Sequence, residues 1–497
     1  MIRIIFLILI SSLGLALSFS PFRFSWLFAW FGFLSFFFAI GSLKTKSKVF
    51  IFSYLEGILF WLFTIYWLIY VTFLGYILLV LYLGLYFAIF GLFFHKFKES
   101  NFLNINFLSA LWVLEEFLRS YLFTGFGWAL LGYSQYKNLF LIQLADIGGV
   151  WLVSFIITAV NIDLYYLFNQ VRKTKYILFI LFLIGISLIY GYFRLPSLNS
   201  SDKFFKISLI QPNIPQEIKW DIQERDFILN KYFNLTEKVI KDSPDLIIWP
   251  EASLPCVLEE VPFYFERVRD FVIKNKVNLL LGAVTYQDGL YYNTAILISS
   301  NGEIKEKYNK IHLVPFGEYI PLRKFFGFLE TIVPIGDFAK GNDYTVFKLL
   351  TSNYELSTTF SVLICFEDIF PEISHQFIKR GANFLINITN DAWFGKSTAP
   401  FQHLSASVFR AIENRVFLLR CANTGISGFI SPEGKITYLK GINDHLIFTE
   451  GYFTQPIGIK ENITPTFYNR YPYLFIGILF FIFGYGIIDK LWKEKRR

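Results

Sequence analysis

Long apolar segments crowd the first 200 residues, and they constrain the fold of this chain more than any other feature. Most approach the roughly 20 residues with which a helix crosses a bilayer. The first is also compatible with a cleaved signal peptide, but an uncleaved helix is favoured because further spans follow at once. The sequence thus predicts a multispanning α-helical membrane domain of about eight spans: Ile4–Phe19, Phe24–Leu43, Val49–Thr72, Leu74–Phe94, Phe102–Phe123, Val150–Phe168, Tyr176–Phe193 and Tyr473–Ile488.

Basic residues in the connecting loops predict the orientation of these spans. Clusters follow the second, fourth, sixth and eighth spans, and Arg3 precedes the first. The intervening loops carry little more than Arg23 and Lys137. With eight crossings, every cluster lies on one side of the membrane, and the positive-inside rule makes that side the cytoplasm. The segment between spans seven and eight is then expected outside the cytoplasm.

That outside segment, about residues 202–456, has the pattern of a soluble α/β domain. Short apolar runs of strand length include "FKISLI", "DLIIWP", "NLLLGAV", "TAILIS", "SVLIC", "FLINI" and "VFLLRC". Amphipathic stretches such as "ERDFILNKYFNLTEKVIKD" and "PFYFERVRDFVIKNK" separate several of them. Strands that alternate with helices indicate a sheet buried on both faces.

Composition argues against a nucleic-acid binder and against a metal site. Apolar residues make up 54% of the chain, charged residues make up 17%, and the net charge of +8 lies largely in short loops between apolar runs. The three cysteines cannot all pair, so no disulfide framework is implied. The five histidines are scattered, and no HxH, HExxH or CxxC spacing occurs. We expect no nucleic-acid partner, no metal and no cofactor.

Three strand ends in the α/β segment each deliver ionisable residues. "DLIIWPEASLP" brings Glu251 to the end of a run that a proline terminates. "YNKIHLVPFGEYIP" contains Lys310 and, eight residues later, Glu318. "VLICFEDIFPE" places Cys365 at the end of a strand, and Pro371 suits the first turn of a following helix. A strand-to-helix turn is where a nucleophile is presented.

These residues fit acyl transfer. Cys365 would be the nucleophile and Glu251 its proton acceptor, while Lys310 would stabilise the thiolate and the oxyanion. The backbone N–H of Phe366 is a second candidate oxyanion donor, and Glu318 and Glu367 would hold Lys310 or the entering substrate in place by hydrogen bonds. Each residue also has an ordinary structural interpretation, such as core filling for a lone Cys. Cys256 and Cys421 keep that interpretation.

The three stretches resemble the Glu, Lys and Cys motifs of the nitrilase, or carbon–nitrogen hydrolase, superfamily. The chain is more closely similar to the apolipoprotein N-acyltransferase family. That resemblance rests on "QPNIPQEIKW", "IIWPEASLP", "YNKIHLVPFGEYIP", "ICFEDIFPE", "NITNDAWFGKSTAPFQHLSASVFRAIENR" and "RCANTGISGFISPEGKI". In the membrane part, "LALSFSPF" and "EEFLRSYLFTGFGWALLGYSQ" agree as well.

The resemblance implies the fold, the site and the reaction. The outside segment would be an α-β-β-α sandwich, with Glu251 as general base, Lys310 as transition-state stabiliser and Cys365 as acylated nucleophile. Trp220 matches a residue on a mobile arm implicated in substrate handling. Many members have Tyr directly after the Cys, whereas this chain has Phe366.

The reaction implied by the resemblance joins two lipid substrates. An acyl chain would pass from a phospholipid to Cys365 as a thioester, and then to the α-amine of a diacylated apolipoprotein. The protein would be a monomer, integral to the bacterial inner membrane, with its catalytic domain in the periplasm. The expected domains are a membrane domain of seven helices (residues 1–200), a catalytic domain (201–456) and a terminal helix with a basic tail (457–497).

Two further stretches suggest contact with lipid. "LRKFFGFLETIVPIG" exposes many hydrophobic residues after Glu318, and Phe325, Phe326 and Phe328 are expected on a lid that dips into the outer leaflet. The alternative is a helix packed in the core. In span five, Glu115 and Arg119 are spaced to pair on one helix face, and head-group contact by Glu115, Glu116 and Arg119 is the alternative.

Two other functions compete with lipid acyl transfer. A membrane-tethered nitrilase-type amidase acting on a soluble amide would need the same three residues but no oily lid. A transporter or scaffold with an inactive α/β domain is the other alternative. The intact Glu–Lys–Cys set argues against it, as does the lack of paired broken helices.

Overall fold

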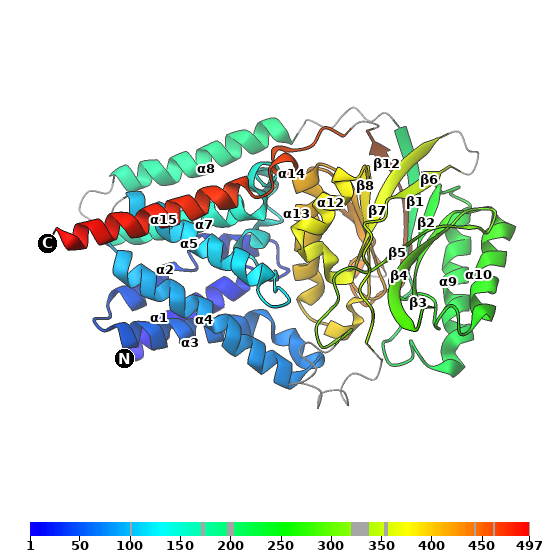
Figure 1. Ribbon diagram of the computed structural model, residues 1–497, viewed down its shortest axis with the longest axis horizontal. Helices are drawn as coiled ribbons and strands as arrows, with labels where there is room; N and C mark the ends of the chain where they lie inside the picture. The colour runs from blue at the N-terminus through cyan, green and yellow to red at the C-terminus, as the bar shows by residue number, and fades with distance from the viewer. Residues whose placement is uncertain are drawn as a thin grey trace. The chain divides into compact units, whose positions relative to one another are not determined.

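The computed structural model describes residues 1–99, 102–169, 174–195, 203–319, 337–351, 356–441, 444–460 and 463–496. The chain forms two compact units, each built from more than one stretch of sequence (Figure 1). The helical unit combines Met1–Ser197, Ser397–Glu413 and Pro465–Arg497, and the α/β unit combines Leu198–Lys396 and Asn414–Thr464.

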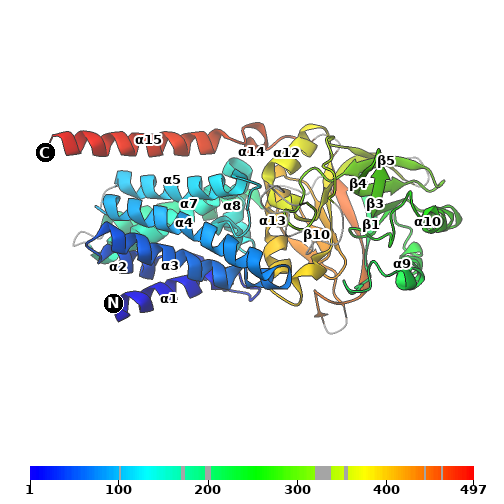
Figure 2. The same cartoon turned by 60° about the horizontal axis from the view of Figure 1, so that its bottom comes forward.

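The helical unit contains the apolar segments. Its longer helices are α1 (Ile2–Leu17), α2 (Leu34–Gly41), α3 (Lys46–Thr64), α4 (Phe73–Phe97), α5 (Phe102–Tyr121), α7 (Ala145–Asn169), α8 (Thr174–Arg194) and α15 (Leu474–Lys495). Figure 2 shows α1, α3, α4 and α5 side by side. Among the described residues, five helices are long and apolar enough to cross a membrane, namely α3, α4, α7, α8 and α15. The predicted count of about eight spans is therefore not confirmed.

The second predicted span, Phe24–Leu43, is not one continuous helix. It is split into the 3-10 helix η1 (Ser25–Trp30) and α2. Asn161 of α7 bridges the break, because its Oδ1 accepts a hydrogen bond from the Phe33 N–H (3.1 Å) and its Nδ2 donates to the Ala29 carbonyl (2.8 Å). A buried side chain thus satisfies backbone groups that a helix would have paired internally. The second predicted span is therefore an interrupted helix rather than a continuous one.

The α/β unit contains two six-stranded sheets in direct contact. One has the order β12-β1-β2-β3-β4-β5 and the other β11-β10-β9-β8-β7-β6. The Cys421 Sγ lies 3.3 Å from the carbonyl oxygens of Ile210 and Ile248 in the facing sheet. The strands are β1 (Lys203–Gln211), β2 (Leu246–Ile248), β3 (Leu279–Gln287), β4 (Leu290–Ile298), β5 (Ile304–Asn309), β6 (Phe347–Leu350), β7 (Ser357–Ile364), β8 (Phe384–Thr389), β9 (Leu418–Ala422), β10 (Gly428–Ile430), β11 (Ile436–Tyr438) and β12 (Gly451–Ile459).

Helices cover the outer faces of this sandwich. α9 (Arg225–Ile240) and α10 (Pro262–Asn275) lie side by side on the first sheet (Figure 1), where their apolar faces share a core with β2, β3 and β4. α12 (Pro371–Lys379) packs against β7 of the second sheet. Each predicted apolar run lies on a strand and both amphipathic stretches form helices, so the α/β prediction is confirmed.

One helix inside the α/β segment of the sequence packs with the helical unit. α13 (Ala399–Asn414) supplies Gln402, whose Oε1 accepts hydrogen bonds from the indoles of Trp67 (3.1 Å) and Trp128 (2.7 Å). Its Nε2 donates to the Thr64 carbonyl at 2.9 Å. The helical unit is therefore assembled partly from residues that the sequence pattern assigns to the other part of the chain.

Candidate active site

Cys365 occupies a strained turn between β7 and the 3-10 helix η6 (Cys365–Ile369). Its φ of 54° lies in the left-handed region, which is unusual for a residue with a side chain. The Asn387 Nδ2 of β8 steadies the turn by donating to the carbonyls of Cys365 (2.8 Å) and Leu363 (3.2 Å). The predicted strand-to-helix turn is confirmed, with Pro371 in the first turn of α12.

A buried lysine and two carboxylates form a cluster in the same unit. The Lys310 Nζ lies 2.9 Å from the Glu318 carboxylate and 3.8 Å from the Glu251 Oε1, and its side chain is 1% exposed. Glu318 also accepts a hydrogen bond from the Val314 N–H at 2.8 Å. The structure therefore brings Lys310 and Glu318 together with Glu251, which the sequence placed at the end of a different strand.

Two asparagines, which the sequence analysis missed, orient the carboxylates. The Asn293 Nδ2 of β4 donates to Glu251 (2.8 Å) and to Glu318 (2.9 Å). The backbone N–H of Asn390 donates to the other oxygen of Glu251 at 2.9 Å. The segment that carries Glu251 lies directly on β3, where a Cβ on Gly282 would come within 2.7 Å of the Glu251 Cα. Only glycine leaves room for this approach.

Ionisation of the thiol and the lysine is coupled to this cluster. Burial, and then the charge of Glu251, raise the pKa of the Cys365 thiol, while Lys310 opposes the rise. Burial acts to lower the pKa of Lys310, but Glu318, Cys365 and Glu251 together raise it above its ordinary value. The raised pKa values favour a neutral thiol and a charged ammonium in the resting site, so a base must remove the thiol proton during the reaction.

Glu367 supports the turn rather than facing open space. It is fully buried, and its carboxylate accepts hydrogen bonds from the N–H groups of Ile364 (2.7 Å), Ile311 (2.8 Å) and His312 (3.1 Å) and from the Tyr308 hydroxyl (2.9 Å). These bonds join the Cys365 turn to the segment that follows Lys310. The sequence predicted that Glu367 holds Lys310 or the substrate by hydrogen bonds, whereas the described bonds hold the backbone on both sides of the junction.

The Glu367 carboxyl makes the stability of this junction depend on pH. Burial raises its pKa to about 7, although the donated hydrogen bonds oppose the rise. The folded protein therefore keeps a proton that the unfolded chain releases, and this contribution to stability is lost as pH rises from about 4.5 to about 7. We expect Glu367→Gln to lower stability by about 1–3 kcal/mol near pH 5, because an amide N–H₂ cannot accept these bonds. The deficit should shrink as pH approaches 7.

Thermal unfolding of detergent-purified protein at several pH values measures this effect. The exposed Glu306→Gln on β5 is the matched control, and it should show no such trend. A deficit of Glu367→Gln that stays constant between pH 5 and pH 8 would contradict the assignment.

Asp368, to which the sequence gave no role, is neutralised by an arginine. The Arg420 guanidinium, fully buried on β9, lies 3.2 Å from Asp368 and 2.9 Å from Asp391. It also donates to the Asn387 side chain at 2.7 Å. Much of the negative charge near the Cys365 turn is therefore already balanced within the fold.

Phe366 and Trp220 lie within the described residues. The Phe366 ring lies 5.3 Å from the Lys310 Nζ, so its face takes part in a cation–π contact. Its N–H is in the first turn of η6, where backbone amides lack acceptors inside a helix. Trp220 is half-buried in a turn after β1. The predicted lid residues Phe325, Phe326 and Phe328 lie outside the described residues.

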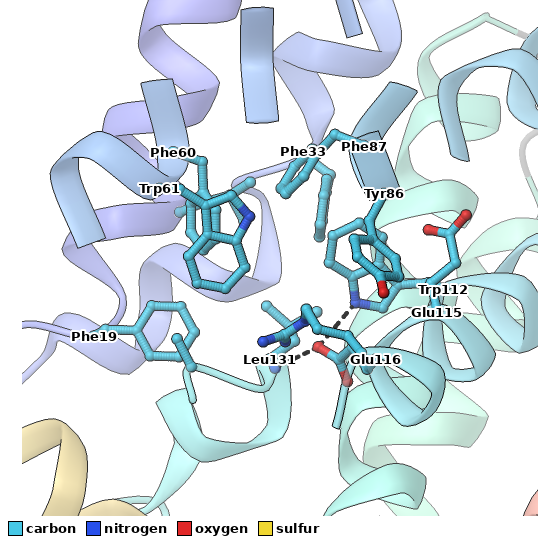
Figure 3. A pocket seen from close by; sticks show the side chains of 13 residues that line it. Phe19, Phe33, Phe60, Trp61, Tyr86, Phe87, Trp112, Glu115, Glu116 and Leu131 are labelled. Carbon is cyan, nitrogen blue, oxygen red and sulfur yellow. Dashed lines mark hydrogen bonds between the residues drawn. The ribbon is translucent and has the colours of Figure 1, made fainter. Parts of the chain in front are cut away.

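A second polar cluster lies in a pocket of the helical unit (Figure 3). Aromatic side chains form most of its wall, and Glu115, Glu116 and Arg119 of α5 line it as well. The Glu116 Oε1 accepts hydrogen bonds from the Trp112 indole (3.1 Å) and the Leu131 N–H (2.6 Å). Arg119 donates to two backbone carbonyls instead of pairing with Glu115. The predicted Glu115–Arg119 pair does not form among the described residues.

The two-sheet sandwich and its buried Glu, Lys and Cys define an enzyme of the carbon–nitrogen hydrolase type. The family model of carbon–nitrogen hydrolases matches residues 206–443, and that of the apolipoprotein N-acyltransferase N-terminal domain matches residues 11–162. The chain belongs to the apolipoprotein N-acyltransferase family. It is therefore an acyltransferase of lipoprotein biosynthesis and an integral membrane protein.

Relatives from distant bacteria support the assignment over most of the chain. The apolipoprotein N-acyltransferase of Geobacter metallireducens is 36% identical over 89% of this chain and 87% of its own length. The apolipoprotein N-acyltransferase of Aquifex aeolicus is 35% identical over 72% of this chain and 78% of its own length. The apolipoprotein N-acyltransferase of Chlorobaculum tepidum is 30% identical over 84% of this chain and 83% of its own length. Because the similarity includes the membrane part, the soluble-amide alternative is not favoured.

Proposed function

We propose that this protein moves an acyl chain from a membrane phospholipid to the N-terminal α-amine of a diacylated apolipoprotein, through a thioester on Cys365. The observation that carries the proposal is the buried Glu251–Lys310–Glu318 cluster, in the same unit as a cysteine held in a left-handed turn. The family of the chain supports the choice of lipid and lipoprotein as substrates.

The first half-reaction forms the thioester. Glu251 takes the proton of Cys365, and the sulfur attacks the ester carbonyl of the phospholipid. Lys310 stabilises the negative charge on the carbonyl oxygen, with the Phe366 N–H as a second donor. The ester C–O bond then breaks, and Glu251 returns the proton to the leaving alkoxide, which departs as a lysophospholipid.

The second half-reaction forms an amide. The neutral α-amine of the apolipoprotein attacks the thioester, and Glu251 takes the proton that the amine loses. The C–S bond breaks and Cys365 recovers a proton, so the enzyme is unchanged. Dividing the transfer at a thioester replaces one difficult step with two easier ones.

The remaining expectations belong to this proposal. We place the protein in the bacterial inner membrane as a monomer, with the α/β unit in the periplasm, because the basic loops favour that orientation. Trp220 would handle substrate, and Phe325, Phe326 and Phe328 would form the lipid-facing lid. The working domains would be residues 1–200, 201–456 and 457–497.

Labelled lipid tests the function directly. The purified protein is incubated with phospholipid that carries labelled acyl chains, with and without a diacylated lipoprotein. Mass spectrometry should find a labelled acyl group on the Cys365 peptide when the acceptor is absent, and a third, amide-linked chain on the lipoprotein when it is present. Release of acyl groups from soluble amides without either product would favour the amidase instead. The absence of adduct and product, beside an active family member, would overturn the proposal.

A further inference from the structure

Lys219 is a buried ammonium that the mechanism above does not use. It lies in the turn that follows β1, and only 3% of it is exposed. Its Nζ donates to the backbone carbonyl of Glu251 at 3.0 Å. In the described part of the chain it forms no ion pair with a carboxylate, although its charge interacts with Glu251 and Cys365. A lysine so deeply buried without an anionic partner is uncommon.

The loop that carries Lys219 is tied to the proposed base. The Gln216 side chain accepts a hydrogen bond from the Asn390 Nδ2 at 2.8 Å. The N–H of the same Asn390 donates to Glu251. The Lys219 N–H in turn donates to the Gln216 carbonyl at 3.4 Å. A flexible lysine would normally extend its amine to water, whereas these contacts hold it over the Glu251 backbone.

The charges of the site show what Lys219 contributes. Among the described residues, Lys310 forms ion pairs with both Glu251 and Glu318, and Asp391 is already paired with Arg420. When Glu251 takes the proton of Cys365, the negative charge moves from the carboxylate to the sulfur, in a region where Lys310 is held by Glu318. A positive charge close to an acidic group favours the ionised form of that group. A second cation fixed at the Glu251 backbone therefore favours an ionised Glu251–Cys365 pair, which is the form that supplies the thiolate.

We propose that Lys219 is a positioning residue, which fixes the backbone of Glu251 and supplies a second positive charge that stabilises the Cys365 thiolate. The inference rests on the proposed function only in taking the thiolate as the nucleophile. The charged and titratable groups that interact with the thiol are Glu251, Lys310, Asp391 and Lys219, and Thr389 contributes a hydrogen bond.

The charge on Lys219 is present only below mildly alkaline pH. Burial lowers the pKa of Lys219 to about 8, and the charges of Glu251 and Cys365 oppose the fall. The ammonium is present below that pH and is lost above it. The wild-type thiolate should therefore lose part of its support as pH rises through 8. An arginine at the same position would stay charged throughout this range.

Alkylation of Cys365 by iodoacetamide tests the inference without any acyl substrate. The rate is followed from pH 6 to pH 10 by mass spectrometry of the Cys365 peptide in the full-length protein. We expect Lys219→Met to slow alkylation at pH 7 by about 10- to 100-fold. Lys219→Arg should keep the rate near wild type at pH 7 and exceed it above pH 8. The buried Cys256 serves as an internal reference.

The exposed Lys274→Met on α10 is the matched control, with an unchanged profile expected. Rates for Lys219→Met that match wild type at every pH would overturn the inference. If Lys219→Met fails to fold, the pH profile of Lys219→Arg decides alone. A Lys219→Arg alkylation rate that runs parallel to the wild-type rate through pH 8 would count against a role for the Lys219 charge. The two proposals can fail separately. If the Lys219 variants change the alkylation rate as expected but the wild-type protein transfers no acyl chain in the lipid assay, the proposed function is rejected and this inference stands.

Discussion

Cys365→Ala will abolish both the labelled thioester and the triacylated lipoprotein. The side chain that bonds to the acyl group is then missing, and none of the neighbouring groups replaces it. We expect acyl transfer to fall by at least about 10⁴-fold, as when other enzymes lose a nucleophile. The measurement is the labelled-lipid assay with both products followed by mass spectrometry. Alanine differs from cysteine by a single heavy atom, the sulfur, so the fold should survive.

Cys256→Ala is the matched control for the loss of a buried thiol. The Cys256 Sγ lies 3.8 Å from the Val261 carbonyl, and burial raises its pKa to about 11. Among the described contacts none joins it to Glu251 or Lys310, so no base is placed to activate it. This variant should keep full acyl transfer. Residual triacylated product from Cys365→Ala, at more than a trace, would mean that the acyl chain does not travel through this sulfur.

Arg420→Met should have the largest effect on stability. It removes the guanidinium that lies 3.2 Å from Asp368 and 2.9 Å from Asp391, and breaking a buried ion pair in this way costs about 3–5 kcal/mol. A loss of this size lowers the melting temperature by on the order of 10 °C in a domain of this length. Thermal unfolding in detergent, followed by the fluorescence of buried tryptophans, measures the shift.

Two comparisons separate this explanation from a general effect of losing arginine. Arg380→Met, at the exposed C-cap of α12, should change the melting temperature little. Adding Asp368→Asn and Asp391→Asn to Arg420→Met should recover part of the loss, because the uncompensated charges are then removed. A triple variant less stable than Arg420→Met alone would contradict the proposed origin of the effect.

The strands and the Glu–Lys–Cys cluster were predictable because each depends on local pattern. Apolar runs of strand length place Glu251 after β2 and Cys365 after β7, at the ends of strands in the two facing sheets. The spacing of Lys310 and Glu318 within one loop also made their contact foreseeable. These features need little information from distant parts of the chain.

Contacts set by tertiary packing were not predictable in the same way. Asn293 and Lys219 are ordinary residues in the sequence, and only the fold brings their side chains to Glu251. Arg420 is 52 residues from Asp368, so no spacing rule links them. The broken second span had no local signal either, since the polar group that permits it, Asn161, lies in α7.

The backbone conformation of Cys365 lowers stability at the residue that the proposed reaction needs. A residue with a side chain in the left-handed region costs of order 1 kcal/mol, whereas glycine adopts it freely. A chain with glycine there would lose the nucleophile and relieve this strain. Selection for heat resistance alone would thus tend to remove the sulfur, so screens for hardier variants of this enzyme need a second, activity-based criterion.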